Sequence, residues 1–114
     1  MDEEYIELIT ELEEENFTRP ERVLFISVIF QALLDATKEK TIVESSRTSV
    51  ERAHARAWFF CSVGVTCDNF EYVCENAGMD PDYTRSFAIK VINSKEIKYV
   101  RQRIRRVLDK SWLR

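Results

Sequence analysis

Four side chains in the middle of the sequence have the chemistry to hold a metal ion. His54, Cys61, Cys67 and Cys74 follow one another with the spacing H-x6-C-x5-C-x6-C. Structural zinc sites usually contain two tight pairs such as C-x2-C, and no such pair occurs here. His54 is also the only histidine, and no Ser or Cys nucleophile has a convincing base partner. We therefore expect reduced cysteines packed in the core, with no metal, no cofactor and no catalytic activity.

A second group of side chains can bind a polyanion through charge. Residues 85–114 contain ten Lys or Arg and two acidic residues, a balance of +8. Residues 1–20 contain eight acidic residues and one Arg, a balance of −7, so the net charge of −3 hides a strong separation. Such asymmetry is typical of a chain with one polyanion-binding end. A uniformly basic domain is absent, so charge alone does not identify nucleic acid as the partner.

The segment 70–93, FEYVCENAGMDPDYTRSFAIKVIN, has the pattern of two helices joined by a glycine turn. The apolar residues of its first half recur at i, i+3, i+4 and i+7, as on one face of a helix: Phe70, Val73, Cys74 and Ala77. Gly78 suits the left-handed conformation that ends a helix. Asp80 can cap the next helix, and Pro81 suits its first turn. DNA-binding helix-turn-helix units are built in this way.

Part of this segment resembles the helix-turn-helix of bacterial repressors of the lactose-repressor type. The shared pattern is V-x-E-x-A-G-hydrophobic, formed here by Val73, Glu75, Ala77, Gly78 and Met79. In those repressors the small residue and the glycine let two helices cross closely. The resemblance implies that residues 81–93 approach the major groove of double-stranded DNA.

A broader resemblance covers residues 20–92. The sequence PERVLF…ALLDA, then ARAWFF, then FEYVCENAGMDPDYTR is similar to small helical proteins of phages and prophages. The positions that carry this likeness are Pro20, Glu21, Arg22, Ala55–Phe59, Phe70, Val73, Cys74, Gly78, Met79, Asp80, Pro81 and Arg85. It implies a compact helical domain of phage origin but no particular activity.

One departure from the repressor pattern decides which residues we expect to contact DNA. The second motif helix starts with Asp80, Pro81 and Asp82, and carboxylates repel phosphates although they can accept from cytosine. Later positions are therefore better candidates for base contacts: Arg85, Ser86 and Lys90. Cations of the last helix are candidates for phosphate contacts: Lys98, Arg101 and Arg105. Arg85 has an equally good alternative, an ion pair with Asp82 three residues earlier.

The remaining chain predicts a single all-α domain, a bundle of five to six helices over residues 1–114. Only two Gly and two Pro occur, which favours long helices over turn-rich sheets. We expect an acidic helix within 1–18, core helices within 19–66, the helix-turn-helix at 68–93, and a basic helix within 95–114. Nothing resembles a signal peptide, and the longest apolar run, Val23–Leu34, is too short to span a bilayer.

Finer boundaries follow from capping residues and periodicity. An amphipathic helix is expected over 3–15, a helix buried on nearly all sides over 20–38, and a loop over 39–48. Ser49 should cap a third helix whose inward residues are Val50, Ala53, Ala57 and Phe60. A turn at Gly64 and a capping box at Asp68–Glu71 should precede the motif. The last helix, about 95–112, has an inward stripe of Ile97, Val100, Ile104, Val107 and Leu108.

These patterns lead to one main functional hypothesis and one alternative. The main hypothesis is a cytoplasmic, sequence-specific double-stranded DNA-binding protein, a phage-type transcriptional regulator that acts as a homodimer. The alternative is a small phage adaptor or inhibitor that binds a host protein such as RNA polymerase, which the acidic N-terminal segment favours. The first hypothesis predicts that Arg101→Ala and Arg105→Ala weaken binding to all DNA, whereas Arg85→Ala relaxes discrimination between sequences.

Overall fold

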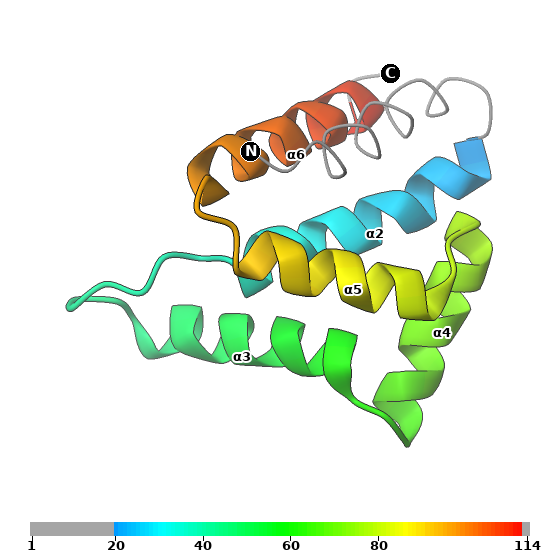
Figure 1. The fold of residues 1–114 in the computed structure, drawn as a ribbon, viewed down its shortest axis with the longest axis horizontal. Coiled ribbons are helices and arrows are strands. Elements are labelled where there is room, and N and C mark those ends of the chain that lie inside the picture. Colours follow the sequence, from blue (N-terminus) through cyan, green and yellow to red (C-terminus); the bar gives the residue numbers. More distant parts are fainter. Residues whose placement is uncertain (1–19, 113–114) are drawn as a thin grey trace.

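The computed structural model describes residues 20–112, which form five α-helices and contain no β-strand (Figure 1). In chain order these are α2 (Pro20–Ala36), α3 (Ser46–Phe60), α4 (Val65–Ala77), α5 (Pro81–Ile92) and α6 (Ile97–Trp112). The predicted all-α fold is confirmed for this part of the chain. The acidic helix expected over 3–15 lies outside the described residues.

Helix α2 is the central element, because α3, α4, α5 and α6 all pack against it. Its inward side chains are almost completely buried: Ile26, Ile29, Phe30 and Leu33. The predicted burial on nearly all sides is wrong for one face, where Leu24 is 54% exposed and Val28 is 44% exposed. Both residues line a groove between α2 and α3 that no other described element fills.

Helix α6 lies alongside α2 and runs in the opposite direction (Figure 1). The predicted inward stripe is confirmed, with Ile97 partly buried and four residues buried: Val100, Ile104, Val107 and Leu108. The helix begins slightly later than expected because residues 95 and 96 form a turn. In that turn the Glu96 N–H donates to the Ser94 hydroxyl at 3.1 Å.

Helix α3 begins earlier than predicted and faces the core differently. Ser45, rather than Ser49, is the N-cap, and its hydroxyl accepts the Thr48 N–H at 3.2 Å. The connection from α2 is therefore residues 37–45 and not 39–48. The residues predicted to face inward are all exposed: Val50, Ala53, Ala57 and Phe60. Ala55 and Phe59 are buried instead.

Aromatic packing explains why α3 faces the core as it does. Apolar residues occur around the whole helix, so their periodicity did not select one face. The Trp58 ring lies edge-on to the Phe70 ring, with 4.9 Å between their centroids. The Phe59 ring also lies edge-on to the Phe70 ring, with 5.8 Å between centroids. These large rings gain more from burial than alanines do, so they determine the rotation of the helix.

Helix α4 also begins before its predicted capping box. Gly64 precedes the helix with φ 94° and ψ −172°, a conformation that essentially only glycine adopts. Asp68 therefore lies inside the first turn, where its charge suits the helix dipole, and it is not the N-cap. The predicted inward face is confirmed, since all four residues are buried: Phe70, Val73, Cys74 and Ala77.

Candidate nucleic-acid interface

Helices α4 and α5 are joined by a tight turn of residues 78–80 and meet at a steep angle (Figure 1). Gly78 adopts the left-handed conformation with φ 71°, as the sequence predicted. The Gly78 N–H donates to the Glu75 carbonyl at 3.1 Å, and the Met79 N–H donates to the Cys74 carbonyl at 2.9 Å. This pair of bonds is a Schellman motif, which satisfies carbonyls at the end of α4. Met79 is buried and fixes the turn against the core.

The start of α5 also follows the prediction. Asp80 is the N-cap, and its carboxylate accepts the Tyr83 N–H at 2.8 Å. Pro81 occupies the first turn, where no backbone donor is lost. Asp82 adds a second negative charge at the positive end of the helix dipole. The caps therefore explain both carboxylates without a ligand.

The outward face of α5 carries both polar and apolar side chains, and its charge is close to neutral. Its exposed residues are Asp82, Tyr83, Ser86, Ile89 and Asn93. Lys90, a predicted base contact, is half-buried on the edge of this face, and Ser86 lies near its middle. The face can hydrogen-bond and make apolar contacts with base edges, but it lacks the cations that hold a phosphate backbone.

Arg85 does not lie on this outward face. Its Nε donates to the Phe59 carbonyl at 3.0 Å, and its guanidinium carbon lies 4.7 Å from the centre of the Phe70 ring. Its Nη1 also forms the ion pair with Asp82 that the sequence offered as an alternative, at 3.2 Å. The Phe59 carbonyl belongs to the last turn of α3, where intrahelical donors are missing. We therefore assign Arg85 to holding α5 against α3 and α4, and not to reading bases.

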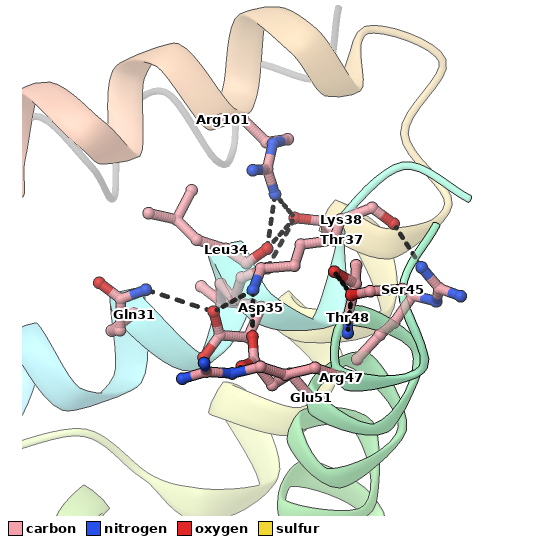
Figure 2. A network of polar contacts seen from close by, with 12 residues as sticks. Gln31, Leu34, Asp35, Thr37, Lys38, Ser45, Arg47, Thr48, Glu51 and Arg101 are labelled. Carbon is pink, nitrogen blue, oxygen red and sulfur yellow. Dashed lines mark hydrogen bonds and ion pairs between the residues drawn. The ribbon is translucent and has the colours of Figure 1, made fainter. Parts of the chain in front are cut away.

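Arg101 is also directed into the molecule. Figure 2 shows its guanidinium reaching from α6 to the end of α2, where Nη1 lies 2.6 Å from both the Leu34 carbonyl and the Thr37 hydroxyl. Burial lowers the pKa of Arg101, and the neighbouring Arg105 lowers it further. Arg56 supports the same helix end, because its Nε donates to the Ala36 carbonyl at 2.9 Å. Arg101 therefore caps the end of α2. Its guanidinium is directed into the molecule and not, as was predicted, toward a surface where it could contact a phosphate.

The other cations of α6 do face outward. Lys98, Arg105 and Arg106 are exposed, and Lys95 is exposed in the turn before the helix. Among the described residues, no carboxylate forms an ion pair with any of the three helix cations. Residues 98, 105 and 106 lie within about 100° of one another around a helix with 3.6 residues per turn, so they share one face. This cationic face, defined by Lys98, Arg105 and Arg106, is the best candidate for phosphate contacts.

Two exposed residues of α5, Tyr83 and Ile89, were not among the predicted site residues. They are 41% and 48% exposed. Their signal in the sequence is the spacing 83, 86, 89, which is opposite to the buried stripe of Thr84, Phe87, Ala88 and Val91. That signal could have found them, whereas the predicted contacts on this helix were all polar or positively charged residues.

The cysteines and the histidine are separate from this face. Cys67 and Cys74 are buried, Cys61 is half-buried, and all three are free thiols. Burial raises the pKa of the Cys67 and Cys74 thiols, so they stay protonated near neutral pH. The described residues contain no cluster of three or more His, Cys, Asp or Glu able to hold a metal ion.

A groove of about 530 Å³ opens between α2 and α3. Its lining is mainly apolar and includes Leu24, Val28, Ala32, His54, Ala55 and Trp58. Two carboxylates at its edge, Asp35 and Glu51, both bind Lys38 (Figure 2). The groove is a second surface that can receive another molecule.

Comparisons with known proteins find no matching family model, no matching curated protein and no matching solved structure. The resemblances to phage proteins and to repressors therefore stay predictions. A search of the described residues for a helix long and apolar enough to cross a membrane finds none.

Proposed function

We propose that this protein binds double-stranded DNA, with the outward face of α5 toward the major groove and the cationic face of α6 toward phosphates. The observation that carries the proposal is the tight α4–turn–α5 unit, whose second helix has an exposed face beside a cationic helix. Ser86, Tyr83 and Ile89 supply base-edge contacts, including apolar contact with thymine methyl groups. Lys98, Arg105 and Arg106 supply the sequence-independent attraction.

This assignment extends to a biological role. We propose a phage-type transcriptional regulator in the cytoplasm of a bacterial host, acting as a homodimer because one helix-turn-helix rarely gives enough affinity alone. Two recognition helices would then contact half-sites about one helical turn of DNA apart. Sedimentation of the free protein and of its complex with a duplex measures this stoichiometry directly.

The decisive experiment is fluorescence anisotropy with short duplexes from around the protein's own gene, titrated at several salt concentrations. We expect one duplex to bind tightly, and log K to fall with log salt with a slope of several units. Lys98→Ala, Arg105→Ala and Arg106→Ala should each reduce that slope by about one unit on every duplex. Lys40→Ala, which removes an exposed cation from the 37–45 connection, is the matched control and should leave the slope unchanged.

Variants of α5 separate sequence reading from general affinity. Ser86→Ala and Ile89→Ala should reduce the preference for the best duplex by about 1–3 kcal/mol each, while binding to unrelated DNA stays the same. Equal losses on all duplexes would argue against base readout by α5. No binding at low salt would remove the DNA-binding proposal altogether.

A second candidate function is binding to a host protein such as RNA polymerase. The specific observation in its favour is the nearly neutral outward face of α5, which carries exposed Tyr83 and Ile89. Aromatic and aliphatic anchors of this kind are typical of protein interfaces. Purified bacterial RNA polymerase, treated with nuclease and mixed with the protein, should then co-elute with it in gel filtration. Tyr83→Ala should abolish that co-elution.

A further inference from the structure

Among the described residues, the three cations of this face form no ion pair with a carboxylate, although the exposed Asp109 lies on the same face of α6. Arg101, in the first half of α6, contacts Leu34 at the end of α2. The two helices are therefore antiparallel, and the Pro20 end of α2 extends past the C-terminal end of α6 (Figure 1). Arg105 and Arg106 lie in the second half of α6. At 1.5 Å per residue in both helices, they lie level with about residues 29–30 of α2, roughly 15 Å along the helix from Pro20, where residues 1–19 join the fold.

The charge of residues 1–19 is complementary to this face. They contain eight acidic residues and one Arg, a balance of −7. Three of the acids, Glu7, Glu11 and Glu14, recur at i, i+4 and i+7, the spacing of a single helical face. Lys98 and Arg105 are likewise seven residues apart on α6. Opposite charges that recur at a similar spacing in the two segments can therefore form several contacts at once.

The length of this segment is sufficient for it to cover α6. A helix of 16 residues is about 24 Å long, at 1.5 Å per residue. Nineteen extended residues reach about 60 Å, and a helix over 3–15 would be about 20 Å long. The segment therefore reaches all three cations whether it is extended or helical.

We propose that the acidic segment 1–19 docks on the cationic face of α6 and occupies the positions where DNA phosphates would bind. The segment acts as an intramolecular competitor, so the protein binds DNA only when phosphates displace its carboxylates. The docking follows from charge and position alone, whereas its effect on DNA rests on the function proposed above.

The docking is tested in the full chain by zero-length carbodiimide crosslinking, which joins carboxylates to amines in contact. Arg106→Lys places an amine in the second half of α6, in addition to Lys98 in its first turn. We expect crosslinks from Glu7, Glu11 or Glu14 to these amines in the monomer, and their loss at about 1 M salt, where charges are screened within roughly 3 Å. Absence of these crosslinks, or equal crosslinking to Lys38 and Lys40, would overturn the docking.

The effect on DNA is tested with a pair of charge-matched variants. Glu7→Gln, Glu11→Gln and Glu14→Gln combined raise the net charge by three. The control, Glu39→Gln, Glu71→Gln and Glu75→Gln combined, makes the same change at exposed residues elsewhere. We expect the first variant to bind DNA at least about fivefold more tightly than the control at low salt. Equal affinity of both variants would refute competition. Crosslinks without DNA binding by either variant would support docking and reject the DNA-binding function.

Discussion

At the scale of single residues, two of the three arginines expected at the DNA surface hold helices together. Arg85 donates to the last turn of α3, and Arg101 donates to the last turn of α2. Both acceptors are carbonyls that lack an intrahelical donor, and neither helix has a basic residue in its own last turn. Guanidinium groups from other helices take that role, because a cation near a helix C-terminus is stabilising.

Arg101→Ala should therefore destabilise the fold more than it changes any surface property. We expect the free energy of unfolding to fall by about 1–3 kcal/mol, since a buried carbonyl and a hydroxyl lose a charged donor. Urea unfolding followed by circular dichroism measures the change. Arg105→Ala, one turn further along α6 and exposed, is the control and should stay within about 0.5 kcal/mol of the wild type. Equal effects of the two variants would contradict the capping role.

The sequence was informative about residues whose role is local. Gly78, Asp80 and Pro81 were predicted correctly because a left-handed turn, an N-cap and a first-turn proline depend on a few neighbours in the chain. The direction of Arg101 depends on Leu34, 67 residues away, and no local pattern contains that information. Charge alone predicted exposure for both arginines, which is the usual outcome but not the one here.

At the scale of elements, the α4–turn–α5 unit is held by backbone geometry on one side and by Arg22 on the other. The Arg22 Nε donates to the Ala77 carbonyl at 2.5 Å, directly before the glycine. A β-carbon added to Gly78 would lie 3.0 Å from that same Nε. Gly78 is therefore required both for its positive φ and for the close approach of α2.

Gly78→Ala should lower the free energy of unfolding by about 1–2 kcal/mol from the left-handed backbone alone. The close contact with Arg22 adds to this loss. Chemical denaturation gives the value, and Gly78→Asn should lose less, because asparagine tolerates this conformation.

A double-mutant cycle with Arg22→Ala separates the two contributions. If the steric contact matters, Gly78→Ala should be less destabilising in the Arg22→Ala background than in the wild type. Full additivity would leave only the backbone conformation as the cause.

Helix α3 shows where element-scale prediction fails. The existence of the helix was predicted correctly, but its start and its inward face were not. Ser45 and Ser49 are both good caps, and alanines on several faces gave no clear stripe. The choice between these registers is made by Trp58 and Phe59 packing on Phe70, which belongs to another helix. Tertiary packing of this kind overrides a weak periodic signal.

At the scale of the whole molecule, ion pairs connect the 37–45 segment to the helices around it. Glu44 accepts two hydrogen bonds from Arg52 of α3, at 2.7 and 3.0 Å, and these lower the pKa of its carboxyl. Lys38 binds Glu51 of α3, and this bond is the main reason that the pKa of Glu51 is lowered and that of Lys38 raised. The connection between α2 and α3 is thus held by charge more than by apolar burial.

Acid should therefore weaken the fold. Because the folded-state pKa of Glu44 and Glu51 is depressed, the unfolded chain binds more protons as the pH falls below about 4.3. The contribution of these two carboxylates to the free energy of unfolding is present above that ordinary pKa. It is lost as the pH falls through their lower pKa in the folded state. Urea unfolding between pH 6 and 3 should show this loss. Glu44→Gln should reduce the pH dependence of the free energy of unfolding, whereas Glu75→Gln on the exposed side of α4 should leave that dependence unchanged.

The capping of α2 by Arg101 has a consequence for the order in which the protein can fold during translation. Helix α2 is the most apolar described element and leaves the ribosome before the other described helices, yet the donors that complete it come from α3 and α6. At roughly 5–20 residues per second, several seconds separate the synthesis of Leu34 from that of Arg101. During that interval the apolar side chains of α2, which later form much of the core, are not yet covered by α6. A chain arrested before α6 therefore exposes the surface that chaperones and proteases recognise.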